Sequence, residues 1–242
     1  MKQFITNKPK KAVCIVSGGL DSICAAAYIS RVKKFEIYII NFTYGQKATN
    51  ESSLAEDFAN MLSAKDYQFV DIGFMKNFYG GNNVLTEDTA GLPSTFRPSI
   101  IVPIRNAIFI TISTAWALSI GAKMVCFGAH MGDRSYPDCR PSFVRSISRS
   151  LNLADSDSIK DKSRQKVSVW CPALSGIDKA CLLKIGHQIL GDALFRTWSC
   201  YSNGVTRKGE TQSRQCGVCE SCLNRKNAFK RAGIEDRTFY NK

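Results

Sequence analysis

Residues 17–22 read Ser17-Gly18-Gly19-Leu20-Asp21-Ser22, directly after an apolar run over residues 12–16. A short apolar run that ends in a glycine turn is typical of a buried parallel strand. Alanine-rich spacing over residues 21–30 then predicts a helix. The N–H groups of a glycine turn and of a helix N-terminus converge on a bound anion. This segment therefore predicts a strand, a phosphate-binding loop and a helix.

The alternation of strand and helix signals continues along the chain. Residues 35–42 and 67–72 have the apolar, β-branched and aromatic content of strands, and residues 51–62 between them have apolar residues at helical spacing. Later segments predict helices over 105–120, 141–151 and 177–190, and strands over 123–128 and 167–170. Alternating elements of this kind predict an α/β fold, with a parallel sheet and helices on both of its faces.

The last part of the chain has a different composition. A chain of 242 residues is long enough for one sizeable core, but from Thr197 onward Cys, Gly, Arg and Lys dominate and periodic apolar content drops. We therefore predict an α/β domain over residues 1–196 and a small metal-binding module over residues 197–242 that packs on it.

Four of the ten cysteines are grouped in this module. Cys216, Cys219 and Cys222 are spaced C-x2-C-x2-C, and Cys200 lies upstream, so four thiolates can close a tetrahedral Zn²⁺ site. An iron–sulfur cluster is the alternative, although the usual fourth cysteine just downstream is missing. Because a closed four-cysteine site activates no water, we expect the metal to hold the C-terminal segment in place.

Composition also bears on location and partners. The basic N-terminus lacks the continuous apolar core of a signal peptide, and the apolar run near residues 107–120 falls short of a membrane span. We therefore predict a cytoplasmic protein with reduced cysteines. The net charge of +13 is high, and basic residues are dense over 140–166 and 207–242. This charge favours polyanionic nucleotides as ligands, or a basic face that docks an acidic macromolecule.

The hexapeptide at residues 17–22 closely resembles the SGGxDS signature of the N-type ATP pyrophosphatases, the PP-loop enzymes. It matches neither the P-loop nor the dinucleotide-binding pattern. The family cleaves ATP between the α- and β-phosphates, so the resemblance implies that the loop grips the departing pyrophosphate. Since Asp21 has the wrong charge to touch phosphate, we predict that it holds Mg²⁺ or a backbone amide. The predicted nucleotide site comprises Ser17, Gly18, Gly19, Leu20, Asp21, Ser22, Phe42 and Tyr44.

Further blocks narrow the resemblance to the 7-cyano-7-deazaguanine synthase family, QueC. They follow the family order over nearly the whole chain: Tyr44-Gly45-Gln46, Leu85-Thr86, Arg105-Asn106, Tyr136-Pro137-Asp138-Cys139-Arg140-Pro141, Thr197-Trp198-Ser199-Cys200-Tyr201 and Cys216-Gly217-Val218-Cys219-Glu220-Ser221-Cys222. The resemblance implies a homodimeric enzyme that carries one zinc per subunit. It also implies the conversion of 7-carboxy-7-deazaguanine and ammonia to the nitrile, with ATP and Mg²⁺.

Such chemistry requires positioning and charge stabilisation more than a catalytic triad. We therefore assign catalytic roles to Asp21, through Mg²⁺, and to the cations Arg105 and Lys179. His130, at the end of a predicted strand, is a further candidate for the site. Asp138 is predicted to accept the N–H groups of a guanine-like edge, and the alternative is a structural Tyr-Pro turn. The predicted substrate-binding residues are Gln46, Tyr136, Asp138 and Arg140.

The chain also departs from the family pattern. Ala48 stands where the family commonly has His, and residues 132–135 are shorter and more basic than usual. These departures favour a second hypothesis, in which the adenylated deazaguanine passes to an amine of a macromolecule such as a protein N-terminus. A hypothesis of another class is a zinc-stabilised nucleic-acid-binding module, suggested by the charge. The complete loop at residues 17–22 argues against it.

Overall fold

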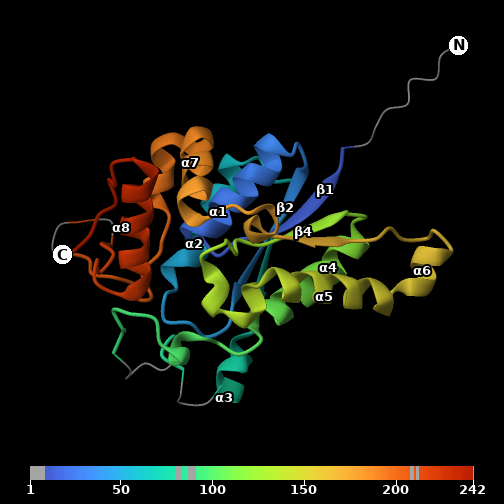
Figure 1. Cartoon of the computed structure of the whole chain (residues 1–242), viewed down its shortest axis with the longest axis horizontal. Helices are drawn as coiled ribbons and strands as arrows, with labels where there is room; N and C mark the ends of the chain where they lie inside the picture. The colour runs from blue at the N-terminus through green and yellow to red at the C-terminus, as the bar shows by residue number, and fades with distance from the viewer. Residues whose placement is uncertain (1–8, 80–82, 87–90, 208–209, 211–212, 242) are drawn as a thin grey trace, which may run out of the picture.

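The computed structural model describes residues 9–79, 83–86, 91–207, 210 and 213–241. Its centre is a five-stranded sheet of order β3-β2-β1-β4-β5, in which every neighbouring pair is parallel (Figure 1). The strands are β1 (Lys11–Ile15), β2 (Glu36–Thr43), β3 (Tyr67–Asp71), β4 (Met124–Cys126) and β5 (Ser168–Trp170). The predicted parallel α/β fold is therefore confirmed. The chain order reverses between β1 and β4, and ligands of open α/β sheets bind at such a point.

The helices connect and cover these strands. They are α1 (Leu20–Ala27), α2 (Asn50–Met61), α3 (Lys76–Tyr79), α4 (Arg105–Ser119), α5 (Pro141–Ala154), α6 (Ser156–Lys160), α7 (Lys179–Leu190) and α8 (Glu220–Ala232). Helix α1 continues into one π-helical turn, Tyr28–Val32. In Figure 1, α8 lies at one end of the molecule and α6 at the other, with the sheet between them.

Alternate residues of each strand pack on opposite faces of the sheet. In β1, Ala12 and Cys14 join the cluster that contains Ile23 of α1 and Phe58 of α2. The residue between them, Val13, joins the cluster on the other face, with residues of α4. Because both faces are covered, the central strand β1 is buried at Ala12, Val13 and Cys14, as expected for a parallel sheet, whereas the edge strand β3 is largely exposed.

Helix α4 and the turn before it form the most apolar stretch. Pro98–Ser119 is long and apolar enough to cross a membrane by length and composition, which the shorter run considered in the sequence was not. In the fold, however, Ile110 and Ala117 of α4 are fully buried, and the helix packs against β1 and β4. Burial in the core thus accounts for part of this apolar composition, since 39% of the apolar window is buried.

Helix α8 is the main element that the sequence pattern does not indicate. Ala228 and Phe229 of α8 share a buried cluster with Leu182 and Leu183 of α7. The fully buried Arg225 donates from Nη1 to the Thr197 carbonyl (3.0 Å) and hydroxyl (2.7 Å). These contacts fix the C-terminal segment to the α/β layer, and the proposed division at residue 196 stays a prediction.

Candidate functional site

A cavity of about 580 Å³ opens at the carboxyl ends of the central strands. Most of the residues predicted for the site line it: Ser17, Gly19, Leu20, Asp21, Ser22, Phe42, Tyr44, Gln46, Arg105, Tyr136, Asp138 and Lys179. Gly18 and Arg140 are not part of the lining. One cavity thus brings together segments that are far apart in the sequence.

The phosphate loop has a conformation that only its glycines allow. Gly18 has φ +91°, and a Cβ there would lie 2.1 Å from the carbonyl oxygen of Glu51. The Ser22 hydroxyl donates to the Gly19 carbonyl (3.1 Å) and accepts from the Ser17 N–H (3.2 Å). Gly19 is the N-cap of α1, so this loop presents the helix N-terminus to the cavity. An anion is favoured at this position.

Two charged residues meet beside the loop. Lys179 Nζ lies 2.8 Å from Asp21 Oδ2. Asp178 caps α7 by accepting the N–H of Cys181 (2.8 Å), which fixes Lys179 as the first residue of that helix. Burial raises the pKa of Asp21, but the neighbouring charges, that of Lys179 foremost, lower it by more, so that the carboxylate stays ionised. Lys179 is likewise a cation, because Asp21 raises its pKa against the effect of burial.

His130 stands on the other side of Asp21. The Gly132 N–H donates to His130 Nδ1 (3.0 Å), so the neutral ring carries its proton on Nε2. That nitrogen lies 3.8 Å from Asp21 Oδ1. Asp133 accepts the backbone N–H of His130 (2.9 Å), and burial raises the pKa of Asp133. The structure therefore places His130 and Asp133 in the cavity next to Asp21.

The middle of the cavity combines aromatic rings with one cation. Phe42 and Phe109 stack with their centroids 4.4 Å apart. Arg105 Nη1 donates to the Tyr44 hydroxyl (2.8 Å). The buried Nε of Arg105 has no hydrogen-bond partner among the described residues. Burial lowers the pKa of Arg105, but Tyr44 and Asp138 raise it by more, so Arg105 is a permanent cation with a free donor. Such a group suits a carboxylate or phosphate oxygen.

The predicted substrate residues are held in different ways. Asp138 accepts the backbone N–H (3.0 Å) and the side-chain amide (3.1 Å) of Asn106, at the start of α4. Gln46 Oε1 accepts the N–H of Tyr44 (2.8 Å), which fixes the turn after β2. Arg140 is exposed and donates from Nε to the carbonyl of Arg134 (2.9 Å). Tyr136 lines the cavity and contacts Phe96 edge-on.

Some residues of the cavity were not anticipated from the sequence. Glu51, in the first turn of α2, faces the cavity next to the loop, and burial raises its pKa to about 8. The Tyr201 hydroxyl donates to Glu220 Oε2 (2.5 Å), and both residues line the cavity. Glu220 and Tyr201 each belong to a family motif, so the motifs could have indicated the two residues but not their contact.

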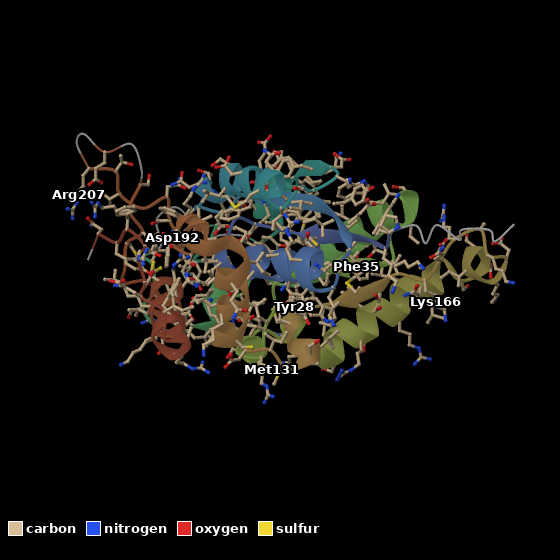
Figure 2. All side chains as sticks on the ribbon, turned by 90° about the horizontal axis from the view of Figure 1, so that it is seen from above. Tyr28, Phe35, Met131, Lys166, Asp192 and Arg207 are labelled. Atoms are coloured by element: carbon tan, nitrogen blue, oxygen red, sulfur yellow. The ribbon has the colours of Figure 1, made fainter. Side chains whose placement is uncertain are left out.

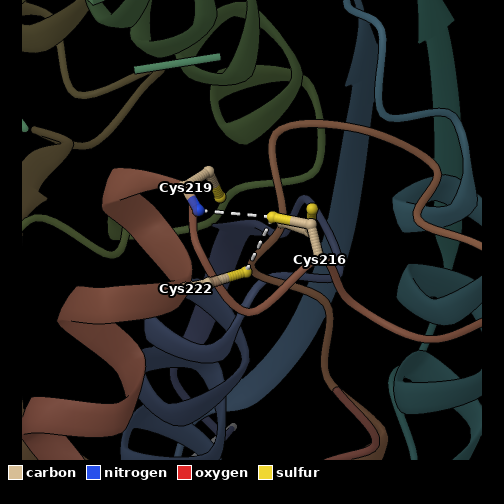
Figure 3. A group of neighbouring side chains, drawn as sticks. Cys216, Cys219 and Cys222 are labelled. Atoms are coloured by element: carbon tan, nitrogen blue, oxygen red, sulfur yellow. Dashed lines mark hydrogen bonds between the residues drawn. The ribbon is translucent and has the colours of Figure 1, made fainter. Parts of the chain in front are cut away.

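The four grouped cysteines form a closed cluster at the border of the cavity. Their sulfur atoms all lie within 4.8 Å of one another. Cys216 Sγ is 3.9 Å from Cys222 Sγ and accepts the N–H of Cys219 at 3.3 Å (Figure 3). A tetrahedral zinc ion with 2.3 Å bonds separates its sulfur ligands by roughly 3.8 Å. The cluster therefore has the donors and the spacing to hold a metal ion.

The phosphate loop and the cysteine cluster are connected by a short segment. The Trp198 N–H donates to the Gly18 carbonyl (3.0 Å), two residues before Cys200. Gln215, next to Cys216, accepts the N–H of Ser199 (3.0 Å) and donates to the Thr197 carbonyl (3.0 Å). Residues 197–200 thus pass from the loop directly to the cluster.

Comparison with known proteins agrees with this geometry. Residues 11–233 match the family model of the queuosine biosynthesis protein QueC. This chain belongs to the QueC family. Curated relatives named 7-cyano-7-deazaguanine synthase include those of Ralstonia pickettii (34% identity, 96% of this chain and 99% of the relative) and Pseudomonas savastanoi pv. phaseolicola (35% identity, 98% of each).

The family assignment confirms the resemblance seen in the motif blocks and the prediction of a QueC-type enzyme. Among solved structures, a predicted subunit of tRNA methyltransferase from Methanocaldococcus jannaschii aligns with 96% of this chain and 93% of its own. The TM-score is 0.46 and the identity 14%. A likeness of this size carries no functional conclusion.

Proposed function

We propose that this QueC-family protein activates the carboxylate of 7-carboxy-7-deazaguanine with ATP, releases pyrophosphate and AMP, and uses ammonia to form 7-cyano-7-deazaguanine. The observation that carries the proposal is the joint presence, in one cavity, of the phosphate loop, the Asp21–Lys179 pair and the Arg105 cation. The names of the curated relatives support the same reaction.

The residues of the loop bind and orient the triphosphate. The N–H groups at the start of α1 and the hydroxyls of Ser17 and Ser22 hold the β- and γ-phosphates. Lys179 stabilises the negative charge that develops on the departing pyrophosphate, whether its ion pair with Asp21 is broken or kept. Arg105 orients the substrate carboxylate towards the α-phosphate, and the rings of Phe42 and Phe109 exclude water from the middle of the cavity.

The bonds change in a simple order. A carboxylate oxygen forms a bond to the α-phosphorus, and the bond from this phosphorus to the bridging oxygen of pyrophosphate breaks. The ammonia nitrogen then bonds to the acyl carbon, AMP leaves with the acyl oxygen, and a surplus proton passes to solvent. A second ATP activates the amide oxygen in the same way, and loss of AMP and two protons from the nitrogen leaves the nitrile.

Two metal ions fit the residues present. Asp21 Oδ1 faces the cavity without a strong partner, at 3.8 Å from His130 Nε2, and a carboxylate oxygen is a typical ligand of Mg²⁺. Bound there, Mg²⁺ would neutralise phosphate charge. The four cysteines would hold Zn²⁺ in a closed site, so its role would be structural.

The direct test is mass spectrometry of the products after incubation with ATP, Mg²⁺, 7-carboxy-7-deazaguanine and ammonium. We expect nitrile together with AMP, and the Lys179→Met variant should form neither at a comparable rate. Lys184→Met, on the exposed side of the same helix, serves as the matched control. If no AMP forms in dependence on the deazapurine, the proposed substrate is wrong.

One feature favours a second acceptor. Ala48, which stands where the family commonly has His, lines the cavity and packs against Cys200 and Trp198, so this position offers no imidazole to the site. The alternative function is therefore transfer of the same acyl-adenylate to an amine of a macromolecule. In the experiment above, it predicts AMP or acyl-adenylate without nitrile when ammonium is the only amine. The predicted homodimer and cytoplasmic location remain predictions.

A further inference from the structure

The outer side of helix α5 carries a row of polar side chains that do not pack in the core. Helix α5 packs on the sheet through Val144 and, in part, through Phe143, Ile147 and Leu151. The opposite side repeats every three or four residues and is exposed along its whole length. We call it the α5 basic face, and it consists of Ser142, Arg145, Ser146, Arg149 and Ser150.

The charge of this face is not neutralised within the described chain. Neither Arg145 nor Arg149 forms a hydrogen bond or an ion pair with any described residue, whereas the nearby Arg164 pairs with Asp155 (2.8 Å). Arginine is a good helix former, so both residues also favour the helix itself. Their unpaired guanidinium groups, one turn apart, leave positive charge on this side that can attract an external anion.

Further cations extend the face at both ends. Asn152 binds the backbone of Val167 through its side chain, at 2.8 and 3.0 Å, which brings the exposed Lys166 beside the end of α5. At the start of α5, Arg140 is fixed to the carbonyl of Arg134, and both residues are exposed. The other basic stretch of the chain is remote, because Lys166 and Arg207 lie at opposite ends of the molecule (Figure 2).

We propose that the α5 basic face docks the sugar-phosphate backbone of a nucleic acid. Arginine and serine side chains are typical phosphate-contacting residues. Leu153 is the one large hydrophobic residue of α5 that is exposed, at 62%, and the face has no aromatic member, so it lacks the aromatic anchors that are enriched in protein–protein interfaces. A two-fold contact centred on this face would bring its positive charges close to the positive charges of the second copy, which repel them.

The position of the face gives the proposal a functional meaning. Tyr136, Asp138 and Cys139 line the cavity, and the chain passes from them directly into Arg140 and α5. The first turn of the face therefore lies next in the chain to residues that line the cavity. The face has no exposed aromatic residue among its members on which bases could stack, so binding should depend on phosphate charge and not on sequence. This inference does not require the proposed function.

The test is fluorescence anisotropy with labelled mixed-sequence RNA and DNA, each single-stranded and duplex, over a salt series. The Arg145→Gln/Arg149→Gln variant removes two positive charges but keeps the helix-forming length of the side chains. The matched control, Lys184→Gln/Lys230→Gln, removes two exposed positive charges from α7 and α8. Thermal unfolding of each variant shows whether the fold is retained.

We expect the α5 variant to lose about tenfold or more in affinity at 0.1 M salt, with a log–log salt slope reduced by about 1.4 for single strands and 1.8 for duplexes. The control should change by less than about threefold. Equal losses in the two variants would show non-specific attraction to net charge and overturn the proposal. The proposal would also be overturned if poly-glutamate bound the parent protein as tightly as RNA does and if this binding disappeared in the α5 variant. The partner of the face would then be an acidic protein.

Discussion

The phosphate loop and the cysteine cluster border the same cavity and are joined through residues 197–200, yet they are built in opposite ways. In the loop, the N-terminus of α1, Asp21 and Lys179 face open space. In the cluster, the thiols face one another and backbone N–H groups, and Cys200 and Cys222 are fully buried. The loop therefore has binding capacity left for a ligand, and the cluster has none beyond the one metal ion that its four thiols could hold.

This contrast separates two kinds of effect. A substitution of a charged side chain that faces the cavity beside the loop should alter the rate of reaction and leave the fold nearly unchanged. A substitution in the cluster should alter the fold, and the rate only as a consequence. The segment from Thr197 to Cys200 couples the two regions, because Trp198 is hydrogen-bonded to Gly18.

The largest effect is expected in the cluster. Cys222→Ser replaces a fully buried thiol that lies 3.9 Å from Cys216 Sγ. Loss of one ligand of a structural metal should lower the free energy of unfolding by at least about 3 kcal/mol, or Tm by roughly 6–12 °C. Thermal unfolding and metal content by mass spectrometry measure this. Cys181→Ser, at an exposed position of α7, is the control, and equal Tm values for both variants would contradict a metal-holding role.

The next effect is expected in the loop region. Lys179→Met should lower kcat/KM for pyrophosphate release by about 10² to 10³, because one charge that stabilises the leaving group is lost. Its Tm should stay within about 4 °C of the parent protein, since Asp21 remains partly exposed to solvent, at 31%. Lys184→Met should leave both quantities unchanged. If Lys179→Met instead lowered Tm strongly and left kcat/KM unchanged, Lys179 would support the fold and not the reaction. The contrast between the loop and the cluster would then be wrong.

A third substitution tests the place where the regions meet. Gly18→Ala puts a methyl group 2.1 Å from the Glu51 carbonyl oxygen, in a backbone with φ +91°. Gly121→Ala is the control, because Gly121 has φ +66° and no atom within 4 Å of its Cβ position. Both variants should lose about 1–2 kcal/mol from left-handed backbone strain. Only Gly18→Ala should lose a further 1–3 kcal/mol from overpacking and bind ATP more weakly in calorimetry.

The comparison also shows which features the sequence could reveal. The phosphate loop and the strands around it were predictable, because each is a continuous segment with its own periodic pattern. Helix α8 was not, because two of its inward positions are Cys222 and Arg225, which break the apolar pattern. Arg225 is accommodated by Thr197 and Thr238, which come from distant parts of the sequence.

Side-chain pairs within the cavity were equally out of reach. Tyr201 and Glu220 meet only because the cluster folds the chain back on itself. The predicted role of Asp138, to accept hydrogen bonds from a guanine-like edge, remains a prediction. In the structure, both carboxylate oxygens of Asp138 already accept hydrogen bonds from Asn106. A motif thus identifies which residues belong to a site, whereas their free hydrogen-bonding capacity depends on neighbours that the motif does not specify.

The smallest effect concerns the ion pair between Asp21 of the loop and Lys179 of α7. The native state lowers the pKa of Asp21 below 3.8, its ordinary value, and raises that of Lys179 above 10.5. The lowered carboxyl pKa contributes stability that is present above pH 3.8 and is lost as the pH falls through the native pKa. The raised amine pKa contributes stability below pH 10.5 that is lost at higher pH.

The Tm difference between the parent protein and Asp21→Asn/Lys179→Met should therefore be constant from about pH 5.5 to 9 and shrink below about pH 4. The exposed pair Asp192–Arg237, with side chains 75% and 58% exposed, provides the control, and its double variant should show no such dependence. A difference that instead grew on acidification would mean that Asp21 is protonated in the native state at higher pH than its partners imply. Asp21 would then enter the reaction as a neutral hydrogen-bond donor, and the loop would no longer offer an anionic ligand for Mg²⁺.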